Sequence, residues 1–223
     1  FAFSITFAPV LAGWVGVPSL FFLTAFLSLL ATLYIALFIP EPKTHAEDRE
    51  IKPSIRNFKL LLTDKNQLML NLSIGLLHAL LVAIFTVVPY EFVYSYGFPK
   101  PEHWKVYLPA VILSLIIMVP STIIAERKGK FKEVHLLGIL AIFTGFALHY
   151  LTKGFLGSVL LVFFFFVGFH LLEPIIPSLL TKLTHKDVRG LSLGFFNTNQ
   201  FMGAFLGGLW GGVSIKMGLN YLL

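Results

Sequence analysis

The 223-residue sequence is 57% hydrophobic and only 13% charged, with a mean hydropathy of +0.83. Soluble domains are about 45–50% apolar and about 25% charged, so much of this surface is expected to face lipid. Cysteine is absent, which excludes a disulfide framework and a thiolate metal site. The net charge of +6 sits in loops between apolar runs, so membrane topology explains it better than nucleic-acid binding does.

Apolar runs long enough to cross a bilayer, which takes about 20 residues, follow one another along the chain. Residues 1–16 form a partial span, and the last few residues begin another. Six complete spans are predicted between them, at 18–39, 66–93, 106–125, 134–151, 155–181 and 190–214. A β-barrel would instead show alternating segments of about ten residues. The predicted fold class is therefore all-α, a polytopic membrane helix bundle.

The segment 41–65 is polar and charged, and we interpret it as a linker between two groups of helices. Its second half has an amphipathic pattern, with apolar side chains on one helical face at Ile55, Phe58, Leu61 and Leu62.

Basic residues are divided unevenly between alternate loops. Thirteen cations lie in one set: Lys43, Arg49, Lys52, Arg56, Lys59, Lys65, Arg127, Lys128, Lys130, Lys132, Lys182, Lys186 and Arg189. The opposite set holds four, namely Lys100, Lys105, Lys153 and Lys216. Basic loops stay in the cytoplasm, so residues 41–65, 126–133 and 182–189 are predicted to be cytoplasmic.

A glycine-rich string in the last complete span, "GAFLGGLWGG" at 203–212, has a counterpart in "SITFAPVLAG" at 4–13. Small residues recur at matching positions, which gives a predicted helix-packing motif of Ala8, Pro9, Ala12, Gly13, Gly203, Gly207, Gly208, Gly211 and Gly212. Both spans run outward from the cytoplasm, so the pair indicates a parallel repeat, as in the two halves of major facilitator transporters. A plain packing face without a transport role is the alternative.

Several strings carry a resemblance to a known family: "GLLHALLVAIFTVVP", "GFPKPEHWKVYL", "VPSTIIAERKGKFKEV", "LLEPIIPSLLTK" and "RGLSLGFFNTNQFMGAFLGG". The chain resembles the drug:proton antiporter branch of the major facilitator superfamily, most closely its YajR-like members. The resemblance implies a truncated twelve-helix fold that runs from helix 5 to the start of helix 12. Residues 1–40 would then end the N-terminal bundle, 41–65 would be the linker, and 66–223 the C-terminal bundle. The branch has glycine where Ala8 and Ala12 stand.

Ionisable residues inside apolar spans are costly and commonly functional. His78 lies near the middle of its span, and His170 and Glu173 are three residues apart, so we expect the latter two to share a helix face. These residues are candidates for proton coupling in a substrate cavity. The alternatives are a structural pair for Glu173 and neutral, hydrogen-bonded histidines within the bundle. Pro174 and Pro177 are expected to bend or loosen this helix.

Other polar residues, in the spans and in the loops, are also candidates for functional roles. Asn197 and Gln200 share a helix face and either line the cavity or hydrogen-bond neighbouring helices. Glu91, at the outer end of its span, is a candidate outer gate residue. The loops hold a candidate cytoplasmic latch, made of Glu126, Arg127, Gly129, Asp187 and Arg189. Glu126 is expected to face a helix N-terminus or a cation of the other bundle, and Asp187 to cap the last span.

Together these features predict a secondary active transporter of the inner membrane, with proton-coupled efflux of small amphipathic compounds by alternating access. Facilitated or proton-coupled uptake, or a non-transporting membrane sensor or scaffold, are the alternatives. No enzyme, cofactor or metal motif is recognised. The expected partners are the lipid bilayer, a small-molecule substrate and protons, with no nucleic acid, and a monomer is the favoured oligomeric state.

Overall fold

The computed structural model describes residues 11–40 and 55–218, with the Asp187 side chain among the few left out, and it is helical without a strand in these ranges. The α-helices are α2 (Val17–Phe38), α3 (Ile55–Thr63), α4 (Lys65–Tyr94), α5 (Trp104–Lys128), α6 (Phe131–Thr152), α7 (Gly154–Leu183) and α8 (Arg189–Lys216). Two 3-10 turns, η1 (Lys100–Glu102) and η2 (Lys186–Val188), precede α5 and α8.

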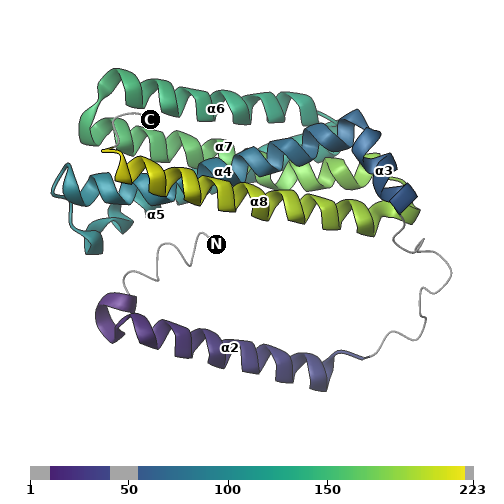
Figure 1. Ribbon diagram of the computed structural model, residues 1–223, viewed down its shortest axis with the longest axis horizontal. Helices are drawn as coiled ribbons and strands as arrows, with labels where there is room; N and C mark the ends of the chain where they lie inside the picture. Colours follow the sequence, from purple (N-terminus) through teal and green to yellow (C-terminus); the bar gives the residue numbers. More distant parts are fainter. Residues whose placement is uncertain (1–10, 41–54, 219–223) are drawn as a thin grey trace.

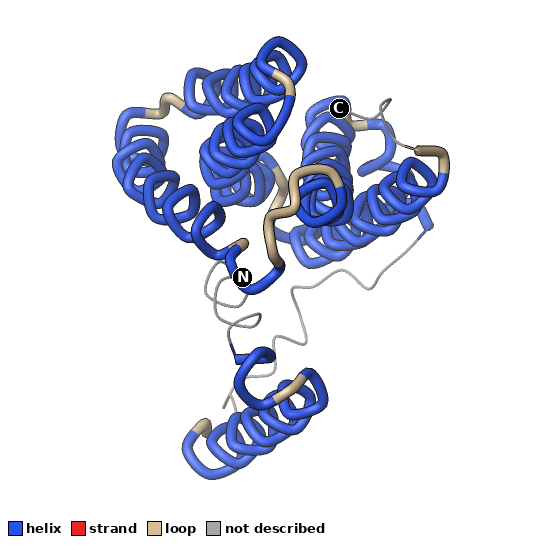
Figure 2. Tube along the Cα trace, turned by 90° about the vertical axis from the view of Figure 1, so that its left-hand side faces the viewer, coloured by secondary structure: helices blue, strands red, loops and turns tan. Residues whose placement is uncertain are grey.

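Helices α4 to α8 pack side by side into one bundle, whereas α2 lies apart from it (Figure 1). Viewed nearly along the helix axes, α2 again lies away from the bundle (Figure 2). None of the α2 residues is buried. Its serine and threonine hydroxyls, such as those of Ser28 and Thr32, donate to carbonyls one turn back in the same helix.

The seam between α4 and α8 is made by glycines. Gly203, Gly207 and Gly211 are buried one turn apart on α8. A Cβ at Gly203 would collide with the Gly75 backbone, and one at Gly207 with the Ala79 backbone. Small residues let helices approach in lipid, where hydrophobic attraction between them is weak. The glycine string therefore places two helix backbones in contact.

The seam between α6 and α7 follows the same rule with different residues. A Cβ at Gly168 would lie 2.5 Å from the carbonyl oxygen of Gly138, and one at Gly145 would lie 3.0 Å from Cβ of Phe164. Large side chains fill the rest of the core. Phe92, Phe165 and Phe166 are completely buried where α4, α5 and α7 meet.

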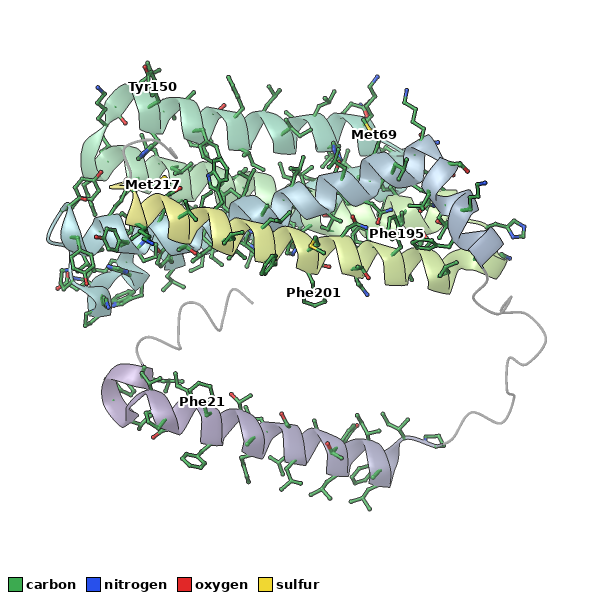
Figure 3. All side chains as sticks on the ribbon, viewed as in Figure 1. Phe21, Met69, Tyr150, Phe195, Phe201 and Met217 are labelled. Carbon is green, nitrogen blue, oxygen red and sulfur yellow. The ribbon has the colours of Figure 1, made fainter. Side chains whose placement is uncertain are left out.

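Aliphatic and aromatic side chains cover the outside of the bundle, as lipid contact requires (Figure 3). Phe201 on α8 and Tyr150 on α6 are 73% and 70% exposed and point away from the helices. On α2, Phe21 is equally open, at 72%. Among the described helices, five are long and apolar enough to cross a membrane: α2, α4, α5 with its preceding turn, α6 and α7.

The predicted spans agree with the observed helices to within a few residues at most ends. Helix α8 is 28 residues long, about 42 Å at 1.5 Å per residue, and so is long enough to cross. It is not among the five because its glycines, Asn197, Asn199 and Gln200 lower its apolar content.

The short helix expected in the linker is α3. On its apolar face Leu61 is buried and Phe58 packs edge-on against Phe195 of α8, with ring centroids 5.4 Å apart.

Parts of the predicted repeat fall outside the described residues. Ala8 and Pro9 lie there, so the superposition of 4–13 on 203–212 stays a prediction. Ala12 and Gly13 are in a short helical stretch at 11–15, where a Cβ on Gly13 would meet nothing within 4 Å among the described atoms. The first part of the linker, 41–54, also lies outside, and the division into domains at 40 and 65 stays a prediction.

Candidate substrate and proton site

The centre of the candidate site is a hydrogen bond between α4 and α8. The His78 Nε2 lies 2.8 Å from the Gln200 amide nitrogen, and its Nδ1 lies 3.2 Å from the Ile74 carbonyl oxygen. Both contacts are satisfied by a neutral imidazole that donates from Nδ1 and accepts at Nε2. The ring also packs edge-on against Phe169 of α7, at 5.6 Å. Three helices thus fix this histidine near the middle of α4.

Glu173 on α7 is the acidic member of the site. Its side chain is exposed, and it lies one turn along α7 from Phe169, whose ring packs against His78. Pro174 and Pro177 lie within the continuous helix α7 and bring no N–H to it. The carbonyl oxygens of His170 and Glu173 therefore lack their usual intrahelical donors, which adds acceptors beside the carboxylate.

His170 is placed differently from the expectation that it shares a face with Glu173. It is only 7% exposed, and its Nδ1 lies 2.7 Å from the Ser114 hydroxyl of α5. The Ser114 hydroxyl itself donates to the Val111 carbonyl oxygen, so the histidine ring supplies the proton of the shared bond. Three positions along a helix turn by about 60°, which is enough to direct His170 into the α5 contact while Glu173 stays exposed.

The polar residues of α8 also differ in their surroundings. Gln200 reaches His78, whereas Asn197 is exposed and is not brought to the same contact. Asn199, beside these two residues, donates to the Phe195 carbonyl oxygen and lies 3.5 Å from the Asn71 side-chain oxygen of α4. Of these residues, Gln200 and Asn199 connect helices, and Asn197 is left facing outward.

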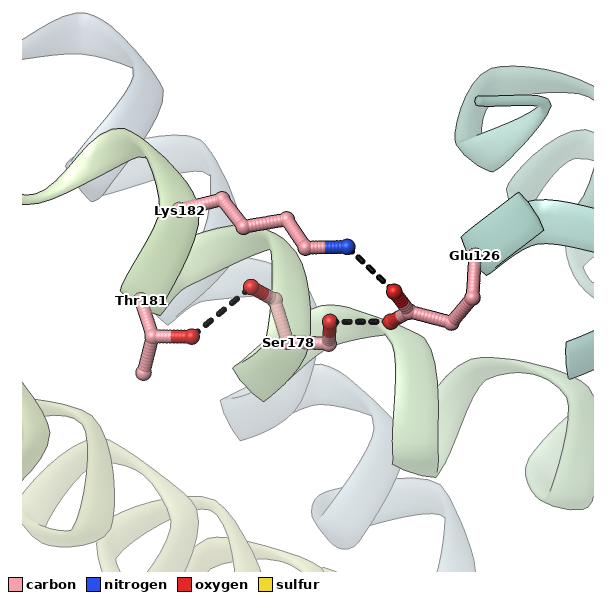
Figure 4. A network of polar contacts seen from close by, with 4 residues as sticks. All are labelled: Glu126, Ser178, Thr181 and Lys182. Atoms are coloured by element: carbon pink, nitrogen blue, oxygen red, sulfur yellow. Dashed lines mark hydrogen bonds and ion pairs between the residues drawn. The ribbon is translucent and has the colours of Figure 1, made fainter. Parts of the chain in front are cut away.

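At the predicted cytoplasmic end, Glu126 of α5 binds α7. Its carboxylate accepts a hydrogen bond from the Ser178 hydroxyl and forms an ion pair with Lys182 (Figure 4). The Lys182 ammonium also lies over the Phe131 ring, 4.2 Å from its centroid. The partner of Glu126 in this structure is therefore Lys182, a cation of the same bundle. The sequence had led us to expect a helix N-terminus or a cation of the N-terminal bundle.

The remaining latch candidates do not join that contact. Gly129 has a φ of 68°, which suits a glycine at the end of α5, and Arg127 is exposed beside it. Arg189 starts α8 and its Nε is buried with no hydrogen-bond partner among the described residues. The Asp187 side chain lies outside the described part of the structure.

A buried polar cluster at the predicted cytoplasmic end of the bundle was not predicted from the sequence. The Gln67 amide donates to the Thr184 hydroxyl, and the Ser192 hydroxyl donates to the Gln67 side-chain oxygen at 2.7 Å. Asn71 donates to the Gln67 carbonyl oxygen one turn along α4. The four side chains are buried and join the ends of α4, α7 and α8. The only sequence signal is the polar pair Gln67 and Asn71 at helical spacing in an apolar span.

The described residues hold no group of three or more histidine and acidic side chains that could bind a metal ion.

Comparison with known proteins agrees with this arrangement of spans. The family model described as Major Facilitator Superfamily matches residues 1–208. The chain belongs to this superfamily. A polytopic helix bundle with a polar contact between two of its helices fits membership, and the protein is a multi-pass membrane protein.

Three curated relatives illustrate the similarity. The chain is 35% identical over 216 residues to "Inner membrane transport protein YajR" of Escherichia coli (strain K12), which covers 95% of the chain and 47% of that protein. It is 27% identical over 211 residues to "Uncharacterized transporter BU466" of Buchnera aphidicola, with coverages of 93% and 53%. It is 26% identical over 182 residues to "Multidrug resistance protein MdtH" of Aeromonas hydrophila, with coverages of 82% and 45%. The chain thus spans about half the length of these relatives.

Proposed function

We propose that this chain is part of a secondary active transporter of the inner membrane that exports small amphipathic compounds in exchange for protons. Residues 66–223 supply the C-terminal bundle and residues 1–40 the end of the N-terminal one. The basic loops 41–65, 126–133 and 182–189 face the cytoplasm. Transporters of this superfamily bind cargo near the bilayer midplane between two halves related by an axis along the membrane normal.

One observation carries the proposal: two ionisable residues, His78 and Glu173, lie within membrane-spanning helices of a bundle of this superfamily. His78 is hydrogen-bonded between α4 and α8, and Glu173 lies on α7 one turn from Phe169, whose ring packs against His78. Ionisable groups within a membrane protein are retained at a cost, which favours a role in ion or proton movement. Glu173 is exposed in the described structure, so it is available to a cavity between the halves.

The proposal assigns separate roles to the two residues. Glu173 takes up the proton and releases it as the cavity opens to each side in turn. In its neutral form His78 is held by Ile74 and Gln200. Once protonated, with the Gln200 amide turned so that its oxygen accepts from Nε2, the imidazolium stabilises the charged Glu173 carboxylate. Asn197 lines the same cavity from α8, and His170 keeps α5 and α7 together as a neutral donor to Ser114.

The full-length protein in proteoliposomes tests the proposal, with a fluorescent lipophilic cation such as ethidium as the probe in a panel of amphipathic compounds. We expect an imposed proton gradient to drive movement of at least one compound. Glu173→Gln is expected to abolish this coupling while the protein still inserts and folds. Glu102→Gln is the matched control, because that carboxylate lies outside the apolar core and pairs with Lys105 at 2.8 Å.

Other outcomes separate the alternatives. Movement that ignores the proton gradient would indicate facilitated diffusion, and inward coupled movement would indicate uptake. A folded protein that moves no compound in the panel would favour the sensor or scaffold. Wild-type proton flux in Glu173→Gln would remove Glu173 from the mechanism.

A further inference from the structure

A second titratable cluster lies far from His78, at the opposite end of the bundle from Glu126. Glu91 is three residues from the end of α4, His149 is three residues from the end of α6, and Ser158 is in the second turn of α7. Three helices therefore bring a carboxyl, an imidazole and a hydroxyl to the same outer end. The proposed mechanism uses none of these three side chains.

Ser158 links the cluster to Glu91 directly. The hydroxyl is fully buried and donates to the Glu91 carboxylate at 3.2 Å. Glu91 itself is half-buried, so water at the outer surface reaches it while the protein covers one side. A partly buried carboxylate with a single fixed donor is a group whose charge depends on its neighbours.

Gly157, the residue before Ser158, holds His149 close to the same turn. A Cβ at Gly157 would lie 3.1 Å from the His149 carbonyl oxygen and 2.9 Å from the Thr152 hydroxyl oxygen. The chain reverses sharply just before, at Lys153 and Gly154, where both residues have positive φ. This reversal presses the end of α6 against the start of α7, so consecutive α7 residues contact His149 and Glu91.

His149 brings a second titratable side chain to this end of the bundle. Its Nδ1 is buried and has no hydrogen-bond partner among the described residues. His149 and Glu91 also interact electrostatically. The other charged groups nearby are engaged elsewhere or exposed: Glu102 pairs with Lys105, Lys100 acts on His103, and Lys153 is exposed. On α4, Tyr90 and Tyr94 stack on each other, 4.5 Å apart.

We infer that Glu91 and His149 form a proton-binding site at the outer end of the bundle, with Ser158 as its hydrogen-bond donor. At high outer pH the carboxylate is charged, and the Ser158 bond ties α4 to α7. A proton delivered from outer water to Glu91 removes the charge of the carboxylate and weakens the Ser158 bond, which frees the end of α4. The site goes beyond the proposed transport function and does not depend on it, because its occupancy can be read at the carboxyl group itself.

Carbodiimide labelling tests this site in the full-length protein in proteoliposomes between pH 5 and 9. Dicyclohexylcarbodiimide reacts with protonated carboxyl groups, and mass spectrometry gives the labelled fraction of the peptide that contains Glu91. Glu102 in the same sample is the internal reference for an exposed carboxyl. Glu91→Gln is the blank.

Removing either neighbour destabilises the charged carboxylate, so Glu91 should keep its proton to higher pH. We expect Ser158→Ala and His149→Gln each to move the midpoint of Glu91 labelling up by about one pH unit, a roughly tenfold change in proton affinity. The Glu102 profile should not move. If Ser158→Ala does not elute as folded protein, the half-buried His149→Gln carries the test alone.

Two results would overturn the site. One is a wild-type Glu91 profile that coincides with that of Glu102. The other is a folded His149→Gln or Ser158→Ala protein whose Glu91 midpoint equals that of the wild type. Neither result bears on Glu173, so this site and the proposed function fail separately.

Discussion

Helices α2 and α7 are both apolar enough to cross a membrane, yet they differ completely in packing. No residue of α2 is buried, whereas half of the 30 residues of α7 are. The α2 segment has no glycine, and its hydroxyls bond to its own backbone. On α7, Gly168 touches the α6 backbone, and Ser158 and His170 bond to other helices.

The chain spans about half the length of its relatives, so the exposure of α2 is a property of this part of the protein and not of its composition. On α7, apolarity marks the span, while small and polar residues mark its contacts with other helices. Lipid tails are as apolar as leucine, so apolar side chains alone give one helix little reason to leave lipid for another. Close backbone approach and interhelical hydrogen bonds supply that reason. This distinction leads to three predictions on stability, each measured on the full-length protein in detergent.

The largest effect is expected at the glycine seam, from Gly207→Ala. The added methyl would collide with the Ala79 backbone, so we expect a loss of about 1–3 kcal/mol in the free energy of unfolding. Gly212→Ala is the matched control on the same helix, since its Cβ meets nothing within 4 Å among the described atoms. There alanine should be neutral or stabilising by up to about 1 kcal/mol. Equal effects at both positions would contradict the seam.

A smaller loss is expected from Ser192→Ala, which removes the donor to Gln67 in the buried cluster. Interhelical hydrogen bonds in membrane proteins contribute about 0.6 kcal/mol on average and up to about 1.7. Thr198→Ala is the control, because Thr198 is exposed and donates only to the Gly194 carbonyl oxygen of its own helix. The unfolding midpoints of the two variants should differ, and coincidence would show that the cluster does not hold the helix ends.

The smallest effect is expected from Glu126→Gln. The Lys182 and Glu126 side chains are 45% and 37% exposed, so solvent and salt screen the pair. We expect a thermal midpoint closer to the wild type than that of Ser192→Ala, with any difference lost at high salt. Glu133→Gln, at an exposed position in the first turn of α6, controls for loss of one negative charge. A larger loss than at Ser192 would assign this pair a structural role.

The difference between span residues and contact residues also explains how much of the fold could be predicted from the sequence. Span boundaries are readable because apolar runs end at charged or turn residues such as Lys65, Lys128 and Gly129. Glycine spacing also indicated that α8 has a contact face. Neither feature says which helix is opposite, and the choice of α4 depends on the packing of the whole bundle.

The candidate site was predictable only as single residues. His78 was recognisable as a costly polar group in an apolar span, but its partner Gln200 is 122 positions away. Ser158 was not recognisable at all, since a serine in a span usually bonds to its own helix, as Ser28 does. The spacing of His170 and Glu173 did not indicate that only His170 would be buried, because that depends on how α5 packs against α7.

The central claim is that the C-terminal bundle borders a cavity that opens to each side of the membrane in turn. A label at Asn197 can report on this cavity, because Asn197 is exposed on α8 and its substitution leaves Glu173 in place. The described chain has no cysteine, so Asn197→Cys can be the single thiol once any others in the full-length protein are removed. A membrane-impermeant maleimide applied from one side or the other should label it from both, in proportions that shift with the proton gradient. Labelling from one side only, whatever the gradient, would contradict the account.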